Sequence, residues 1–266
     1  MSGRWLEVSS ASIRFADVQK TYPSARGPIH ALKDINLDIA AGDFVSVLGP
    51  SGCGKSTLMK CLAALEPITG GRISIGDQTV TAPPDNMGIV FQRDVLLDWR
   101  TILDNVLVTA ELRGLDKRAH RARAMELLTL FGLKDYADRY PWELSGGMRQ
   151  RASICRALLV DPALLLMDEP FGALDAMTRD ELNIELRRMW QETGKTVVFI
   201  THSITEAVYL SERIVVMSRN PGRIVEVFDV DLPKERPLAL RDASEFGHYS
   251  AHVRGIFAAM GVFKGS

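Results

Sequence analysis

The strongest chemical signal in the chain is a glycine-rich stretch that ends in Lys-Ser-Thr. The stretch consists of Gly49, Pro50, Ser51, Gly52, Cys53, Gly54, Lys55, Ser56 and Thr57. An apolar run precedes it, and apolar residues at helical spacing follow it. Glycines between a strand and a helix let backbone N–H groups turn toward an anion, and the helix N-terminus adds a positive dipole. The stretch therefore predicts a phosphate-binding loop, in which Lys55 reaches the terminal phosphates and Ser56 ligates Mg²⁺.

Polar residues also follow three other apolar runs. Asp168 and Glu169 come directly after one run, and Gln92 and His202 end two more. Ligands of open α/β sheets bind beside the carboxyl ends of the strands, so we expect these side chains to lie near the phosphate loop. In that position Asp168 would bind the metal ion, and Glu169 would orient and deprotonate an attacking water. The competing interpretations are a helix-capping acid pair and a histidine held in the core by hydrogen bonds.

Hydrophobic periodicity indicates the strands that must position these residues. Ile13 and Phe15 alternate with polar neighbours, as do Ile35, Leu37 and Ile39, which is typical of antiparallel strands with one wet face. The runs before the phosphate loop and before Asp168 are apolar throughout, as in a parallel sheet covered on both faces. Further strands are expected at 72–76, 87–91, 196–200, 214–217 and 224–228. The fold class is therefore α/β.

A helical block interrupts the strands between about 93 and 160. Thr101 is followed three residues later by Asp104, a variant of the capping box, and helical spacing continues to about Gly132. Another helix opens at 144–148 and ends before Pro162. The tail after residue 228 carries apolar residues on roughly one helical face. We expect the tail to pack on the rest of the chain or to join a dimer contact.

Composition narrows the class of protein. The 266 residues are 46% hydrophobic, enough for a sizeable core, and 32 Lys+Arg nearly balance 33 Asp+Glu. The absence of a basic stripe argues against nucleic acid as a partner. No apolar run approaches the roughly 18 residues that span a bilayer, and the N-terminus lacks the apolar stretch of a secretory signal. The cysteines have neither metal nor disulfide spacing, which predicts reduced thiols in the cytosol.

The segment Leu144-Ser145-Gly146-Gly147, followed by Arg149-Gln150-Arg151, resembles the signature of ATP-binding-cassette (ABC) ATPases. The other motifs of that family are present in order over residues 12–228. They are the adenine-stacking aromatic at Tyr22, Walker A at 49–57, the Q-loop at Gln92, Walker B at 164–169, the D-loop at 173–175 and the switch histidine at His202. This ordered set is far more specific than a phosphate loop alone.

The resemblance implies a P-loop NTPase fold of the ABC type, with an N-terminal antiparallel β region and an inserted helical subdomain at about 93–160. The ABC ATPase domain would span 12–228, and a helical tail would span 229–266. ATP and Mg²⁺ are the implied cofactors. The implied catalytic residues are Glu169, His202 and Gln92, the metal site is Ser56, Gln92 and Asp168, and the nucleotide site includes Tyr22, the phosphate loop and Asp175.

The resemblance also implies partners. Ser145, Gly146 and Gly147 would form a second anion site, which in this family meets the ATP held by another chain. The expected assembly is a head-to-tail dimer with a second copy or a paralogous cassette, bound to permease subunits at the cytoplasmic face of the bacterial inner membrane. A periplasmic or extracellular solute-binding protein would deliver the solute.

The region around Trp99 resembles importers for nitrate, sulfonates, taurine or pyrimidine precursors. Leu96 and Trp99 would contact a coupling helix of the permease; the alternative is that Trp99 packs within the helical block. The expected function is thus ATP hydrolysis that powers uptake of such a solute. Alternatives are an exporter cassette, a soluble ABC ATPase acting on DNA or ribosomes, or a P-loop GTPase or kinase. The sequence lacks the coiled-coil insertions typical of DNA-repair ATPases and the second cassette typical of ribosome-binding ones. It also lacks the Asn-Lys-x-Asp motif of GTPases.

Overall fold

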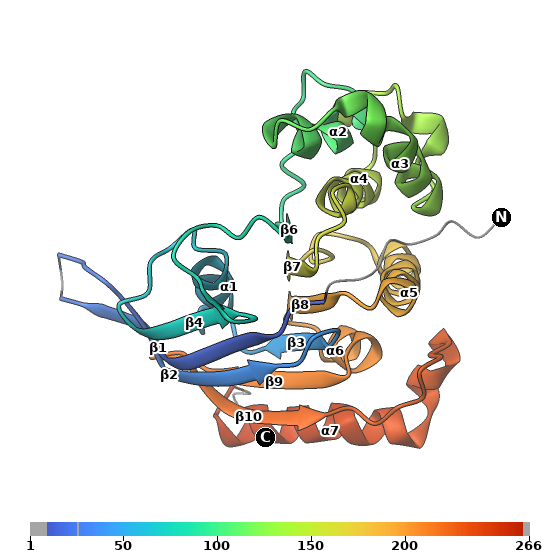
Figure 1. Cartoon of the computed structure of the whole chain (residues 1–266). Helices are drawn as coiled ribbons and strands as arrows, with labels where there is room; N and C mark the ends of the chain where they lie inside the picture. Colours follow the sequence, from blue (N-terminus) through green and yellow to red (C-terminus); the bar gives the residue numbers. More distant parts are fainter. Residues whose placement is uncertain (1–9, 26, 263–266) are drawn as a thin grey trace.

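The computed structural model describes residues 10–25 and 27–262, and its strands form two sheets (Figure 1). The strands are β1 (Ile13–Tyr22), β2 (Ile29–Ile39), β3 (Phe44–Leu48), β4 (Gly70–Ile75), β5 (Gln78–Thr79), β6 (Met87–Val90), β7 (Leu164–Asp168), β8 (Thr196–Thr201), β9 (Arg213–Ser218) and β10 (Arg223–Asp229). The α-helices are α1 (Lys55–Leu62), α2 (Ile102–Leu112), α3 (Lys117–Leu130), α4 (Gly146–Leu158), α5 (Ala176–Thr193), α6 (Ile204–Leu210) and α7 (Ser244–Ala259). Short 3₁₀ helices cover Lys134–Tyr136, Pro141–Glu143 and Leu238–Asp242.

The smaller sheet is antiparallel, in the order β2-β1-β4-β5. Ile13 pairs with Ile39 and Phe15 with Leu37, so the alternating apolar residues of both strands lie on one face. That face is buried against residues of β3 and α1, while the intervening polar residues are exposed. The predicted antiparallel region with one wet face is confirmed.

The larger sheet has the order β10-β9-β3-β8-β7-β6 and is parallel from β9 to β6. All residues of β3 and β8 are buried, as expected for strands covered on both faces. The carboxyl ends of β3, β6, β7 and β8 meet at one edge of this sheet. The sheet therefore brings together the residues that follow these four strands.

Helices α2, α3 and α4 lie between β6 and β7 in the chain, and α2 and α3 form a lobe at the top of Figure 1. Thr101 caps α2 by accepting a hydrogen bond from the backbone N–H of Asp104 at 3.2 Å, as predicted. The structure is helical over most of the span predicted to about Gly132, but it divides the span into two helices. Gly114 adopts a φ of +67°, which ends the first helix, and Asp116 caps the second.

The tail packs on the rest of the chain, the first of its two predicted arrangements. Its helix α7 runs along β10 at the bottom of Figure 1. Phe246, Val253 and Phe257 are buried in the same core cluster as Phe44 of β3. The guanidinium of Arg236 is buried and donates hydrogen bonds to the backbone oxygens of Tyr209 and Ser211, at 3.0 and 2.8 Å.

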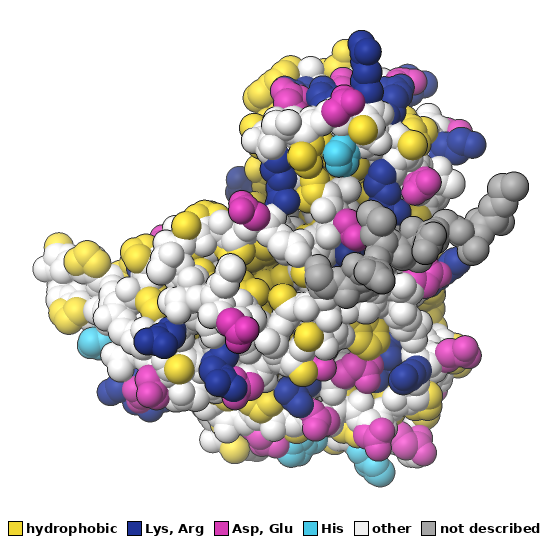
Figure 2. Space-filling view, in the orientation of Figure 1, with side chains coloured by type: hydrophobic (Ala, Val, Ile, Leu, Met, Phe, Trp, Pro, Cys, Tyr) yellow, Lys and Arg dark blue, Asp and Glu magenta, His cyan; other side chains and the backbone are white. Residues whose placement is uncertain are grey.

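Charged side chains of both signs are interspersed over the face shown in Figure 2, in line with the near-zero net charge. Among the helices of the described residues, none is both long enough and apolar enough to cross a bilayer.

Candidate functional site

The glycine-rich stretch forms a tight loop between β3 and α1. Gly52 and Gly54 have φ values of +75° and +100°, a region that favours glycine. Gly54 is the N-cap of α1, and a Cβ there would lie 2.9 Å from the backbone oxygen of Ala31. The backbone N–H of Cys53 donates to the oxygen of Pro50 at 3.2 Å and closes the turn. Ser51 and Ser56 are exposed, Thr57 is half-buried in α1, and Cys53 is buried.

Lys55 lies at the centre of this loop. Its side chain is only 5% exposed, and its Nζ donates to the backbone oxygens of Gly49 and Pro50, at 2.8 and 3.3 Å. The same Nζ lies 4.0 Å from Oε1 of Glu169. The ammonium thus faces the loop, where the helix dipole also favours an anion.

Ser56 and Asp168 meet across the edge of the larger sheet. The Ser56 hydroxyl donates to Oδ1 of Asp168 at 3.0 Å. Burial raises the pKa of Asp168, and the charge of Glu169 adds to that effect. A neighbouring cation would relieve both costs. One hydroxyl and one carboxylate are the donors that Mg²⁺ combines with phosphate oxygens and waters. These two donors fit a magnesium–nucleotide complex, in which phosphate oxygens and waters supply the other ligands.

Glu169 lies between Lys55 and His202. Its Oε2 is 3.1 Å from Nδ1 of His202, and its backbone N–H donates to the oxygen of Ile200 at 2.9 Å. Glu169 has a φ of +45°, a strained conformation for a side chain with a Cβ. The interpretation of His202 as a core histidine is wrong, because its side chain is 59% exposed.

Gln92 follows β6, two residues past the end of the strand, and is exposed. The pairing of Val90 with Met167 puts the end of β6 beside the end of β7, which carries Asp168. Tyr22 is the last residue of β1 and is half-buried, with Nζ of Lys20 4.5 Å from its ring centroid.

The signature residues begin another helix. Ser145 is the N-cap of α4, and its Oγ accepts a hydrogen bond from the N–H of Met148 at 3.3 Å. Ser145 and Gly146 are exposed, but Gly147 is buried. A Cβ on Gly147 would lie 2.6 Å from Cγ2 of Thr178, so this glycine allows α4 and α5 to approach closely. Helix α4 contacts α2, β6 and α5, whereas α1 contacts β2 and β7. The starts of α1 and α4 therefore belong to helices that pack against different elements of the chain.

Asp175 is exposed and caps α5, with Oδ1 accepting from the N–H of Thr178 at 3.0 Å. That backbone hydrogen bond lowers the pKa of the Asp175 carboxyl.

Sequence reasoning missed the side chains that tie the loop after Gln92 to α4. Nε of Arg149 lies 2.8 Å from Oδ2 of Asp94, and Nη1 of Arg156 donates to the oxygen of Val95 at 2.7 Å. These partners are more than 50 residues apart in the chain, so no local pattern reveals them. Of the two apolar residues in this loop, Leu96 packs on the core, while Trp99 is 74% exposed. The interpretation that Trp99 packs within the helical block is wrong.

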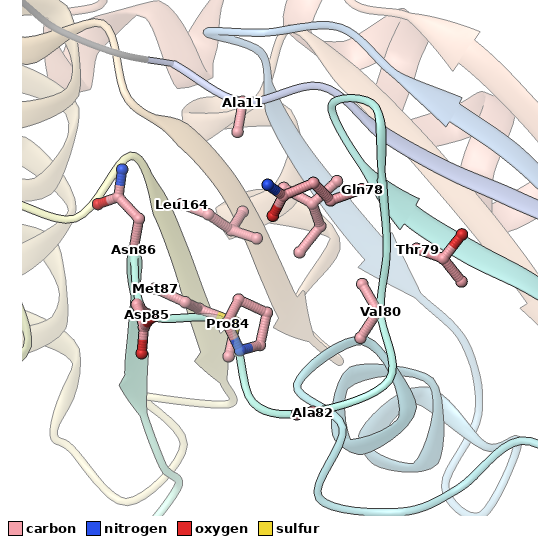
Figure 3. Close-up of a pocket in the computed structure, with 11 residues that line it drawn as sticks. Ala11, Gln78, Thr79, Val80, Ala82, Pro84, Asp85, Asn86, Met87 and Leu164 are labelled. Atoms are coloured by element: carbon pink, nitrogen blue, oxygen red, sulfur yellow. The ribbon is translucent and has the colours of Figure 1, made fainter.

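A pocket of about 230 Å³ opens at the opposite edge of the larger sheet (Figure 3). Met87 and Leu164, the first residues of β6 and β7, line it together with the β4–β5 hairpin and Ala11. None of the predicted site residues lines this pocket. The candidate site is therefore the carboxyl edge of the sheet and not this pocket.

Comparisons with known proteins identify the family of the chain. A protein-family model described as ABC transporter matches residues 32–172. The taurine import ATP-binding protein TauB of Rhizobium johnstonii is 49% identical over 203 residues, 76% of this chain and 78% of that protein. TauB of Escherichia coli is 47% identical over 196 residues, covering 74% and 77%. An ABC transporter ATP-binding protein of Methanocaldococcus jannaschii is 42% identical over 244 residues, covering 92% and 90%.

A solved structure has the same fold. The dimeric, post-hydrolysis form of the ATP-binding cassette MJ0796 bound to ADP and Pi superposes with a TM-score of 0.74 at 33% identity, covering 83% of this chain and all of that one. The predicted α/β fold of the ABC ATPase type is confirmed. The family model, the relatives and the MJ0796 structure together show that the chain belongs to the ABC transporter family, as an ATP-binding ATPase domain.

Proposed function

We propose that the chain is the ATP-hydrolysing subunit of an importer that takes up a small solute of the nitrate, sulfonate, taurine or pyrimidine-precursor kind. The observation that carries this proposal is the 47–49% identity to taurine import ATP-binding proteins over about three quarters of the chain. An exporter cassette, a DNA- or ribosome-acting ATPase and a P-loop GTPase or kinase have no comparable support among these relatives.

The residues of the proposed site would bind the phosphates, the adenine ring and Mg²⁺. The phosphate loop, from Gly49 to Thr57, holds the nucleotide phosphates through backbone N–H groups, and Lys55 neutralises their charge. Tyr22 stacks on the adenine ring. Ser56, Asp168 and Gln92 would hold Mg²⁺, which supplies charge neutralisation on the phosphates when bound. The spacing of Ser56 and Asp168 at 3.0 Å supports this assignment.

Glu169 would accept the proton of the attacking water, and His202 would contact the terminal phosphate and hold Glu169 in place. The 3.1 Å contact between the two side chains supports this arrangement. Nζ of Lys55 lies 4.0 Å from the other carboxylate oxygen of Glu169, so the carboxylate also faces the phosphate loop.

The second phosphate contact would come from another chain. Ser145, Gly146 and Gly147 begin α4, which lies on different elements from the phosphate loop. A head-to-tail dimer would bring the signature of one chain onto the ATP of the other, with Asp175 near the contact. The partner is a second copy or a paralogous cassette, and the dimeric MJ0796 structure at 33% identity supports such an assembly. ATP binding would close the dimer and hydrolysis would reopen it.

The importer needs a membrane partner. We infer that permease subunits dock on the loop after Gln92, where Trp99 offers a large exposed apolar side chain. The chain would then be a peripheral protein on the cytoplasmic face of the bacterial inner membrane. A periplasmic or extracellular solute-binding protein would complete the system, and substrate choice would reside in that protein and in the permease.

The test uses tagged chain carrying Glu169→Gln, trapped with Mg·ATP in cells and purified from detergent-solubilised membranes. The copurifying proteins are identified by mass spectrometry. We expect a multi-spanning permease in near-stoichiometric amount, and a Trp99→Ala variant in the same background recovers much less of it. Recovery in the soluble fraction alone, with ribosomes or DNA-repair proteins, would overturn the transport assignment.

A further inference from the structure

Two charged residues that the mechanism above does not use lie between the loop of Asp175 and the loop of His202. Glu206, on α6, is 5% exposed, and Arg179, on α5, is partly buried. Burying a charge is costly unless it is paired and hydrogen-bonded, so such a pair calls for a physical reason.

Glu206 holds the loop of His202. Its Oε2 accepts a hydrogen bond from the hydroxyl of Thr201, and that hydroxyl oxygen accepts one from the backbone N–H of Ser203 at 3.0 Å. The two residues on either side of His202 are thus tied to one carboxylate. The histidine ring itself remains outside this network and points to Glu169, 3.1 Å away.

Arg179 holds the other loop. Its Nη2 donates to the backbone oxygen of Leu174 at 2.8 Å, directly before Asp175. Its Nε lies 3.5 Å from Oε1 of Glu206. Thr178, the preceding residue, touches the position where a Cβ on Gly147 would lie. The first turn of α5 therefore contacts the D-loop, the signature helix and Glu206.

The far end of α6 is fixed independently. Arg187 donates to the oxygen of Leu210 at 2.6 Å, and Arg236 donates to the oxygens of Val208 and Tyr209 at 3.1 and 3.0 Å. Two buried guanidinium groups therefore hold the C-terminal carbonyls of this seven-residue helix, where a positive charge is favourable. With that end fixed, Glu206 determines how the N-terminal end of α6, and the loop of His202 before it, sits against α5.

The contact between the two side chains is not at its optimum. Nε of Arg179 is buried and has no hydrogen-bond partner, and its 3.5 Å separation from Glu206 is longer than the roughly 2.7–2.9 Å of a charge-assisted bond. The loop of Asp175 and the loop of His202 are linked through these two side chains.

We propose that Glu206 and Arg179 are positioning residues for ATP hydrolysis, which hold the loop of His202 and the loop of Asp175 in a fixed relation. This inference rests on the proposed ATPase function. Neither residue is among those assigned to the nucleotide or to the metal. They act through the placement of His202 against Glu169.

The test compares the full chain with its Glu206→Ala, Arg179→Ala and double variants, assayed with Mg·ATP well below their melting temperatures. We expect each single variant to lower kcat by about 10- to 100-fold, with KM and nucleotide affinity nearly unchanged, because the His202 loop is misplaced. The kcat of the double variant is expected to equal that of the less active single variant, because the pair acts as one unit. Glu206→Gln should retain most of the wild-type kcat, unlike Glu206→Ala, since its amide oxygen still accepts a hydrogen bond from the hydroxyl of Thr201.

Thr201→Val provides a second route should Glu206→Ala fail to fold. It removes the hydroxyl link with little change in volume, and it should reproduce the selective loss of kcat. The matched control is Asp161→Asn, which disrupts the ion pair with Lys195 (2.5 Å apart, 33% and 2% exposed) at the other edge of the sheet. That control should lower stability and leave kcat near wild type.

Three results would overturn the inference: wild-type kcat in the folded variants, additive losses in the double variant, or a loss of nucleotide affinity equal to the loss of kcat. An inactive wild-type chain would instead contradict the proposed function, so the two failures are distinguishable.

Discussion

The carboxylate of Glu169 lies between the side chains of Lys55 and His202. Lys55 lies 4.0 Å from one of its carboxylate oxygens and His202 3.1 Å from the other. Its backbone is held at a φ of +45° by a hydrogen bond to Ile200, at the end of the neighbouring strand. Strained backbone of this kind persists only where surrounding contacts determine it, and it is common at catalytic sites.

At this scale we predict the behaviour of Glu169→Gln. The amide keeps the shape of the side chain but cannot accept a proton, so kcat should fall about 100-fold or more. The affinity for Mg·ATP should stay within about twofold, because the phosphate loop is intact. Turnover is measured by phosphate release and affinity by calorimetry. Glu192→Gln, at an exposed pair with Arg188 on α5, serves as the control. Near-wild-type hydrolysis by Glu169→Gln would remove Glu169 from the role of base.

At the scale of elements, one carboxylate joins three segments around α2. Glu111 accepts two hydrogen bonds from the guanidinium of Arg100, at 2.7 and 3.0 Å, and lies 3.1 Å from Nζ of Lys117 at the start of α3. Arg100 ends the loop that follows Gln92. The bond from Arg100 and then that from Lys117 lower the pKa of Glu111 to about 2. This cluster thus fixes the loop with Trp99 against the helical lobe.

The lowered pKa gives a prediction for stability against pH. A carboxylate whose pKa is depressed by folding stabilises the native state above its unfolded pKa, and this contribution is lost as pH falls through the folded pKa. Glu111→Gln should therefore be less stable than wild type at pH 7, and the difference should shrink between about pH 4.3, the ordinary value for Glu, and about pH 2. Urea unfolding at stepped pH measures this, with Glu126→Gln, at the more exposed pair with Arg123, as the control. A difference independent of pH would contradict it.

At the scale of the whole molecule, the proposed site combines two helix starts that pack against different elements of the chain. Lys55 begins a helix that contacts β2 and β7, and Ser145 caps a helix that contacts α2, β6 and α5. Each helix start offers backbone donors to an anion. The proposed head-to-tail dimer would make two equal sites from these two halves by symmetry.

This arrangement predicts complementation between defective chains. In a Glu169→Gln background, Lys55→Ala disables the phosphate-loop half of the site, and Ser145→Arg disables the signature half. Neither variant alone should retain ATP in a closed dimer. An equal mixture should retain it in about a quarter of the sites, because half of the dimers are mixed and each has one intact site. Bound ATP is counted after gel filtration. Retention no higher in the mixture than in the separate variants would show that both halves act within one chain.

The sequence by itself determined the local chemistry and the class of fold. The phosphate loop, the acid pair at the end of β7 and the signature could be recognised because each is a short pattern with local backbone requirements. These requirements are glycine at positive φ, an apolar strand and an N-cap hydroxyl, respectively. Alternation of Ile13 and Phe15 likewise specified a half-exposed sheet. The helix break at Gly114 was missed because an isolated glycine inside a helical pattern is often tolerated.

Only the tertiary structure decided the distances and the supporting contacts. It brought Ser56 to within 3.0 Å of Asp168, 112 residues away, and His202 to within 3.1 Å of Glu169. It also revealed Glu206 and Arg179, whose partners lie on separate elements and leave no periodic trace in the sequence. The physical reason is that strand order and helix packing arise from burial summed over the whole core, whereas sequence patterns report only what neighbouring residues require.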